Sequence, residues 1–205
     1  MADHYFSATP ASAGELRTRT VRLADREIEI STAAGVFSPE HLDTGTRVLL
    51  DHVPDPAPGA LLDLGCGWGP IALDAALRAR DAGVDLDVWA VDVNERAREL
   101  TARNAEYLGL PGIRAVAPED VPDDVRFSSL WSNPPIRVGK AALHAMLEEW
   151  VPRLAPDGTA HLVVAKKLGA DSLLAWLGER FSPDCTVERI TTAKGFRVLR
   201  IQRSS

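Results

Sequence analysis

The pattern of hydrophobic and polar positions changes along this chain near Pro58. Before that point, residues 20–32 alternate between apolar and polar side chains on either side of Ala24-Asp25, which is typical of a β-hairpin. A compact apolar group at residues 48–53 then predicts a helix that ends at the prolines following it. After Pro58, short apolar runs alternate with segments of helical periodicity, which predicts a parallel sheet with helices on both faces.

The pattern predicts seven strands in the part of the chain after Pro58. These strands are expected near residues 60–64, 86–91, 113–117, 127–132, 159–165, 184–190 and 196–202, with helices near residues 69–81, 94–108, 139–152 and 169–179. The last two strands have only a short break at residues 192–195, so we expect them to form an antiparallel hairpin. The prediction is one α/β domain over residues 1–205, with an N-terminal arm, hairpin and helix over 1–58 and a core over 59–205.

A glycine-rich turn follows the first strand of this core. The strand ends at Asp63, and Gly65, Gly67 and Gly69 then alternate with other residues before Pro70 begins a helical pattern. Glycines at such a turn allow the backbone to approach a ligand without interference from a Cβ atom. Their spacing differs from that of the G-x-G-x-x-G dinucleotide fingerprint, which weakens a nicotinamide or flavin hypothesis.

Two further strand ends carry polar residues. Asp92 ends the next predicted strand, about one βαβ unit after the glycine turn, where a carboxylate can accept hydrogen bonds from both hydroxyls of a ribose. The strand at 127–132 is followed directly by Asn133, Pro134 and Pro135. Because the carboxyl ends of parallel strands meet at one edge of a sheet, we expect all three segments to lie close together.

Together these motifs resemble the class I S-adenosylmethionine-dependent methyltransferases, in the subgroup that methylates planar nitrogens. The chain is most similar to the bacterial small-subunit ribosomal RNA guanine-N2 methyltransferases. The resemblance extends over nearly the whole chain and includes His4-Tyr5-Phe6-Ser7, Gly35-Val36-Phe37-Ser38, Asp43-x-Gly45-Thr46-Arg47 and Lys194-Gly195-Phe196-Arg197-Val198-Leu199. It implies a Rossmann-like fold with a mostly parallel, seven-stranded sheet that ends in an antiparallel hairpin.

The resemblance also implies positions for the parts of S-adenosylmethionine. Asp63 is expected near its ammonium group, either directly or through water, Asp92 at the ribose hydroxyls and Asp120 at the adenine amino group. The remaining cofactor contacts would come from Gly65, Cys66 and Gly67 at the methionine and ribose, Val93 or Asn94 beside the adenine, and Asn133. An ordinary solvated loop residue remains the alternative interpretation of Asp120.

Asn133, Pro134, Pro135 and Ile136 are the predicted catalytic segment. The exocyclic amine of a base is a poor nucleophile because its lone pair is delocalised into the ring. The Asn133 side-chain oxygen and the Pro134 carbonyl could accept its two N–H groups and hold the nitrogen in line with the methyl group, so that catalysis is mainly positioning and electrostatics. The alternative is that Asn-Pro-Pro is only a turn after a strand.

The position of Ile136 is often aromatic in the resembled subgroup, where the ring stacks on the target base. Stacking would then have to come from Phe37, Tyr5 or Phe6. Predicted substrate contacts are Phe37, Arg137 and Lys140. For the N-terminal segment a purely structural interpretation also stays open, with Phe37 as a core anchor and Thr46 as a helix cap.

Composition limits the possible partners and the compartment. The chain of 205 residues has a net charge of −6, which is unusual for a protein that handles RNA. A local basic patch in the C-terminal half could compensate, although solvated surface charges are the alternative; its candidates are Arg137, Lys140, Lys166, Lys167, Lys194, Arg197 and Arg200. The chain has no membrane-spanning apolar run or signal-peptide pattern, so we expect a cytoplasmic protein whose two cysteines are free thiols. Because its histidines are dispersed, we expect no metal site.

Three functions remain open at this point. The first is methylation of an exocyclic base amine, most simply guanine N2 of 16S ribosomal RNA, with ribosomal RNA or a 30S particle as the partner. The second is methylation of a protein glutamine amide, which presents the same planar NH2 group to the same motif. The third is a non-catalytic protein that binds S-adenosylmethionine or assists assembly.

Overall fold

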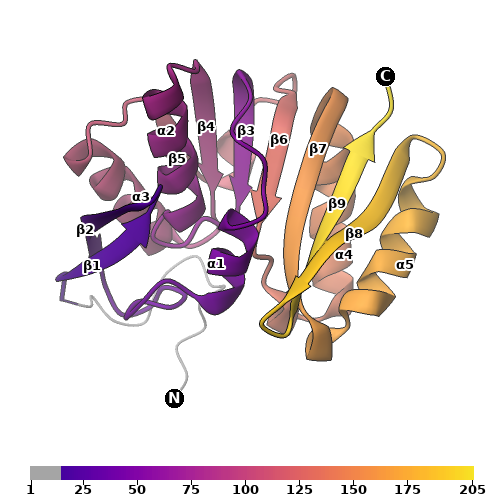
Figure 1. Cartoon of the computed structure of the whole chain (residues 1–205), viewed down its shortest axis with the longest axis horizontal. Coiled ribbons are helices and arrows are strands. Elements are labelled where there is room, and N and C mark those ends of the chain that lie inside the picture. Colours follow the sequence, from indigo (N-terminus) through magenta and orange to yellow (C-terminus); the bar gives the residue numbers. More distant parts are fainter. Residues whose placement is uncertain (1–14) are drawn as a thin grey trace.

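The computed structural model describes residues 15–205, in which a seven-stranded sheet has the order β5-β4-β3-β6-β7-β9-β8 (Figure 1). The strands are β3 (Gly59–Leu64), β4 (Leu86–Val91), β5 (Ile113–Val116), β6 (Phe127–Ser132), β7 (Leu154–Ala165), β8 (Cys185–Ala193) and β9 (Phe196–Arg203). Neighbouring strands from β5 to β7 are parallel, whereas β9 is antiparallel to both β7 and β8. The structure confirms the predicted mostly parallel sheet and its C-terminal antiparallel hairpin.

Five α-helices accompany the sheet: α1 (Thr44–Leu50), α2 (Pro70–Ala82), α3 (Glu95–Tyr107), α4 (Lys140–Trp150) and α5 (Ala170–Phe181). Side chains of a strand alternate between the two faces of a sheet. Leu61 of β3 therefore packs in a cluster with residues of α1 and α2, whereas Leu62 packs in a second cluster with residues of α4 and α5. Helices thus cover both faces, and the carboxyl ends of β3, β4, β6 and β7 all lie at one edge of the sheet, which we call the carboxyl edge (Figure 1).

The predicted N-terminal hairpin is present as β1 (Arg17–Leu23) and β2 (Arg26–Thr32). Its turn residues, Ala24 and Asp25, have φ angles of 45° and 59°, as a tight two-residue hairpin turn requires. One face of the hairpin packs in a cluster with α2 and α3 through the buried residues Val21, Leu23, Ile28 and Ile30. The hairpin is therefore part of the same folded unit as the core.

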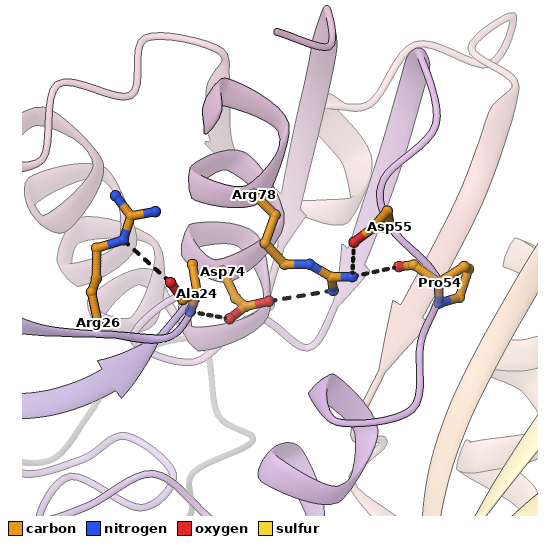
Figure 2. Close-up of polar contacts among 6 residues, drawn as sticks. All are labelled: Ala24, Arg26, Pro54, Asp55, Asp74 and Arg78. Carbon is orange, nitrogen blue, oxygen red and sulfur yellow. Dashed lines mark hydrogen bonds and ion pairs between the residues drawn. The ribbon is translucent and has the colours of Figure 1, made fainter. Parts of the chain in front are cut away.

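Two polar residues of α2 attach segments on either side of this helix (Figure 2). The Ala24 N–H in the hairpin turn donates to Asp74 Oδ1 at 2.7 Å, and Arg78 Nη1 lies 3.7 Å from Asp74 Oδ2. Arg78 Nη2 donates to the Pro54 carbonyl at 3.0 Å and to Asp55 Oδ1 at 2.6 Å. Burial raises the pKa of Asp74. The pair therefore connects the hairpin, α2 and the segment between α1 and β3.

Replacing Asp74 is expected to destabilise the fold. Asp74→Ala leaves the Ala24 N–H without its acceptor and the Arg78 guanidinium without its buried ion-pair partner, which should lower the free energy of unfolding by about 2 kcal/mol in urea denaturation. Asp55→Ala is the matched control, since its side chain is 91% exposed, and it should cost less than about 1 kcal/mol. Equal losses in the two variants would contradict the structural role of Asp74.

No helix within residues 15–205 is both long enough and apolar enough to cross a lipid bilayer. Cys66 and Cys185 are both free thiols, as the sequence predicts.

Candidate active site

The glycine turn joins β3 to α2 at the carboxyl edge. Gly65, Gly67 and Gly69 have φ angles of +81°, +59° and +95°, a region that side chains disfavour. A Cβ atom at Gly69 would lie 3.0 Å from Thr101, whereas one at Gly65 or Gly67 would have no neighbour within 4 Å. Gly69 is therefore needed for packing against α3, and the other two glycines leave open space beside the backbone.

That open space belongs to a pocket formed by three separate segments. The pocket is lined by Phe37, Ser38, Asp43, Thr46, Gly65, Cys66, Gly67, Trp68, Pro70, Ile71 and Asn133. The structure thus brings together the segment around α1, the glycine turn and the start of the Asn-Pro-Pro motif. Burial raises the pKa of the Cys66 thiol, to which the Thr101 hydroxyl donates at 3.5 Å, so this thiol stays protonated in the pocket wall.

The Asp92 carboxylate lies directly against the glycine turn. Its Oδ2 atom accepts the Gly67 N–H at 3.0 Å, and its Oδ1 atom accepts the Asn94 N–H at 2.9 Å. Burial raises the pKa of Asp92, and the two N–H groups partly offset that effect. Asn94 is the N-cap of α3 and donates to the Gly35 carbonyl at 2.9 Å, whereas Val93 is 47% exposed. Of the two candidates for the adenine, Val93 is thus the one with a free apolar surface.

Asp120 occupies the next position along the carboxyl edge. It ends the short 3-10 helix η1 (Pro118–Asp120), just after β5, and its side chain is exposed. The Asp92 N–H donates to the Val116 carbonyl at 3.3 Å, so the ends of β4 and β5 are adjacent. This placement keeps Asp120 a candidate for the adenine amino group.

Asp63 contacts the backbone beside the glycine turn, and its expected place near the ammonium group of the cofactor stays a prediction. Its side chain is fully buried and does not line the pocket, and its Oδ2 atom accepts the Ala72 N–H in the first turn of α2 at 2.9 Å. Burial raises the pKa of Asp63 to about 8. Within residues 15–205 its Oδ1 atom has no hydrogen-bond partner. Asp63 therefore holds the end of β3 to the start of α2 and supports the glycine turn from below.

Asn133 is held in one orientation by two acceptors from the segment around α1. Its Nδ2 group donates to Asp43 Oδ2 at 2.9 Å and to Thr46 Oγ1 at 3.0 Å. A carboxylate only accepts hydrogen bonds, so Asp43 determines which end of the amide faces it. Both amide hydrogens are thereby used, and within residues 15–205 no donor hydrogen-bonds the Oδ1 atom at the other end of the amide.

The two prolines and Ile136 form a tight turn after Asn133. The Pro134 carbonyl accepts the Ile136 N–H at 2.8 Å, and Pro135 has φ −74° and ψ 73°, which is an inverse γ-turn. A carbonyl oxygen has a second lone pair for another donor. Ile136 begins the 3-10 helix η2 (Ile136–Val138) and packs on the core cluster beneath α4. Its side chain therefore supports the turn from the core side.

The segment around α1 does not follow the purely structural interpretation of Phe37 and Thr46. Phe37 is 47% exposed at the pocket, so its interpretation as a core anchor is wrong. The N-cap of α1 is Asp43, whose Oδ2 atom accepts the Thr46 N–H at 3.1 Å, while the Thr46 hydroxyl serves Asn133. Trp68 also contributes, because its Nε1 group donates to the Ser38 carbonyl at 3.2 Å and fastens this segment over the glycine turn.

The other predicted substrate contacts are only partly described. Lys140 is the exposed first residue of α4. Arg137 lies in η2, but its side chain is outside the described part of the structure, as are Tyr5 and Phe6. In the described part of the chain, no group of three or more His, Cys, Asp and Glu side chains is arranged to hold a metal ion.

Comparison with known proteins identifies the family. The model of the methyltransferase small domain family matches residues 27–200, and the chain belongs to this family. Enzymes of this class use S-adenosylmethionine as the methyl donor.

Individual relatives agree with this assignment. The uncharacterized protein YbxB of Bacillus subtilis is 33% identical over 99% of this chain and 100% of its own length. Ribosomal RNA small subunit methyltransferase C of Psychromonas ingrahamii is 30% identical over 90% of this chain, which spans about half (51%) of that relative. The 16S rRNA methyltransferase RsmC of T. thermophilus, solved with AdoMet and guanosine, has a TM-score of 0.79 at 23% identity, covering 95% of this chain and 52% of that one. The last similarity establishes the class I methyltransferase fold.

Proposed function

We propose that this protein transfers a methyl group from S-adenosylmethionine to an exocyclic amine of a nucleobase, with guanine N2 of 16S ribosomal RNA as the substrate. The observation that carries the proposal is the orientation of Asn133. Asp43 and Thr46 hold its NH2 group, so that its oxygen is the available acceptor in a pocket that the glycine turn also lines. An acceptor is what an NH2 substrate requires at this position.

The residues around the glycine turn fit the methyl donor. The open space at Gly65 and Gly67 allows a ligand to lie against the backbone, and the Asp92 carboxylate is positioned there to accept the ribose hydroxyls. Val93 offers an apolar surface to the adenine. When bound, S-adenosylmethionine supplies a methyl group made electrophilic by the attached sulfonium.

The residues of this chain then position the nucleophile. Asn133 Oδ1 accepts one N–H of the base amine, and the second lone pair of the Pro134 carbonyl accepts the other. These two acceptors hold the nitrogen in one orientation and favour the positive charge that it develops as the new N–C bond forms. The C–S bond of the donor would break as the N–C bond forms, which leaves a neutral thioether. The methylated nitrogen would then lose its proton to solvent, so the step requires no strongly basic side chain.

The Thr46 hydroxyl should affect turnover through Asn133. Thr46→Val removes one of the two acceptors that orient the amide, and kcat should fall by about tenfold, the value of one net hydrogen bond. Thr46→Ser restores an acceptor at this site and should recover most of the lost kcat. The two variants are compared by steady-state kinetics and by calorimetric titration with S-adenosylmethionine, whose Kd should stay within about twofold of the wild-type value. Similar kcat values for the Val and Ser variants would contradict the orienting role.

The relatives named for ribosomal RNA methylation support the choice of substrate, although this chain spans about half of their length. A protein glutamine amide is the second candidate, and a specific observation favours it. Ile136 occupies the position expected for a stacking aromatic residue and is packed on the core, so stacking on a planar base depends on Phe37 or on residues outside the described part.

Transfer of labelled methyl from S-adenosylmethionine to naked 16S ribosomal RNA, isolated 30S subunits and total cell protein distinguishes the candidates. Nucleoside analysis should find the label as N2-methylguanosine. Label in protein alone would favour the glutamine function. Binding of S-adenosylmethionine without label in any substrate would favour the non-catalytic function.

A further inference from the structure

The lysines of this chain have an unusual distribution. The chain contains 23 basic residues, of which only four are lysines: Lys140, Lys166, Lys167 and Lys194. All four are exposed, and all four lie at or beside the carboxyl edge. We call this group of four the lysine edge.

The fold brings these positions together from three connections. Lys140 begins α4 shortly after the Asn-Pro-Pro motif, and Lys166 and Lys167 form the 3-10 helix η4 (Lys166–Leu168) directly after β7. Lys194 is in the turn between β8 and β9, and the Lys166 N–H donates to the Gly195 carbonyl at 2.9 Å. The turn is therefore held against the end of β7, at the same edge of the sheet (Figure 1).

The lysines of the lysine edge differ from the arginines in their ion pairing. At least eleven of the nineteen arginines form ion pairs with acidic side chains. None of the four lysines forms an ion pair with an acidic residue within residues 15–205. Asp171, the acid nearest in sequence to Lys167, instead pairs with the buried Arg197. In a chain of net charge −6, four uncompensated positive charges at one edge are available for an external anion.

The lysine edge also lies on a defined side of the active site. β6 and β7 are adjacent parallel strands, with Ser132 paired to Leu162, so that Asn133 and Lys166 both emerge from the carboxyl edge on neighbouring strands. Asp92 and Asp120 emerge from β4 and β5, beyond the glycine turn on the opposite side of Asn133. The side proposed for the cofactor thus carries Asp92 and Asp120 together with Arg98, whereas the four lysines lie on the side that faces away from it.

We infer that the lysine edge binds phosphates of the RNA strand that carries the target base, so that the strand crosses the ends of β6, β7 and the β8–β9 turn. This inference rests on the proposed function. Lysine ammonium groups suit this task because they are mobile point charges that can follow a flexible single strand, and neutralising phosphates releases bound counterions. The exposed side chains of Val138 and Leu168 lie among the lysines and offer apolar contacts to unstacked bases.

Salt-dependent binding of a short fluorescein-labelled single-stranded RNA, measured by fluorescence anisotropy, tests the lysine edge without requiring turnover. The variant carries Lys166→Ala, Lys167→Ala and Lys194→Ala. At about 0.1 M KCl its affinity should fall by at least about tenfold, and the slope of log K against log salt should become shallower by about 2, since each phosphate contact contributes about 0.7 for single strands. The corresponding triple Lys→Arg variant keeps the charge and should keep the slope.

Arg126→Ala is the matched control. Arg126 is exposed just before β6, at the opposite edge of the sheet, and its guanidinium donates to backbone carbonyls rather than to an acid. Its loss should leave the slope unchanged. An unchanged slope and affinity in the triple Ala variant, or an equal loss in Arg126→Ala, would overturn the inference.

Methyl transfer assays separate this inference from the proposed function. Wild-type binding through the lysine edge without methyl transfer to RNA would contradict the proposed function and leave only the phosphate-binding part of the inference standing. Methyl transfer with the same KM for RNA in the wild type and the triple Ala variant would contradict the inference alone. Calorimetric titration with S-adenosylmethionine should give the same Kd in all variants, which shows that the cofactor side is intact.

Discussion

Asn133→Ala should lower kcat for methyl transfer by about 100-fold or more while the Kd for S-adenosylmethionine stays within about twofold. The alanine removes the acceptor that positions the target amine and leaves the Pro134 carbonyl as the only one of the pair. It also leaves Asp43 and the buried Thr46 without their shared donor. Single-turnover kinetics with saturating cofactor measures the chemical step, and calorimetry measures the cofactor affinity.

Asn133→Asp is the informative companion variant. It keeps oxygen acceptors but loses the two N–H groups, and it places a second carboxylate next to Asp43. Repulsion between the two should turn the new side chain out of position, so this variant should also be nearly inactive. Retention of wild-type kcat in Asn133→Ala would show that the amine is positioned by other groups and would remove the main support for the proposed chemistry.

Asp92→Ala should raise the Kd for S-adenosylmethionine by about 100-fold or more. Two charge-assisted hydrogen bonds to the ribose hydroxyls are each worth about 1.5–3 kcal/mol, and both are lost. Asp92→Asn keeps one acceptor oxygen and should give an intermediate Kd. Calorimetric titration of both variants provides the comparison.

A truncated ligand separates the ribose role from a general disturbance of the glycine turn, because Asp92 also accepts the Gly67 N–H. Methylthioadenosine has the ribose and adenine but lacks the amino acid portion. If Asp92 binds the ribose, its replacement should weaken methylthioadenosine and S-adenosylmethionine by similar factors. A loss confined to S-adenosylmethionine would assign the effect to the turn around the methionine portion.

Much of the fold could be predicted from the sequence because it depends on local periodicity. The short apolar runs after Pro58 correspond to the observed strands. The short break predicted at 192–195 correctly indicated an antiparallel pair, although β8 extends to Ala193 and leaves only Lys194 and Gly195 in the turn. The boundaries differ where the local pattern is ambiguous. β7 begins at Leu154 rather than near residue 159, because an irregularity in its pairing with β6 lets the strand extend through a polar stretch.

The candidate site was less predictable because it depends on contacts between distant segments. Asp43 and Asn133 are 90 positions apart, and only the fold shows that the N-cap of α1 also orients the amide. Aspartate is a residue type favoured at a helix N-cap, but that preference does not reveal that Asp43 also contacts Asn133. Asp63 is a second case, since a strand-end acid beside a glycine turn predicts a place near the ligand, whereas only the fold shows that it is buried and accepts the Ala72 N–H of α2.

The hydrogen bond from Trp68 to Ser38 has a thermodynamic consequence for the two ligands. Trp68 belongs to the glycine turn, whereas Ser38 adjoins Phe37, so one contact joins the backbone proposed for the cofactor to the segment proposed for the base. A ligand that shifts either segment changes the free energy with which the other ligand binds. Linkage requires that each ligand changes the binding free energy of the other by the same amount. The affinity of the protein for its methyl donor is then a property to be measured both with and without the acceptor, and the ratio of the two values is the coupling between them.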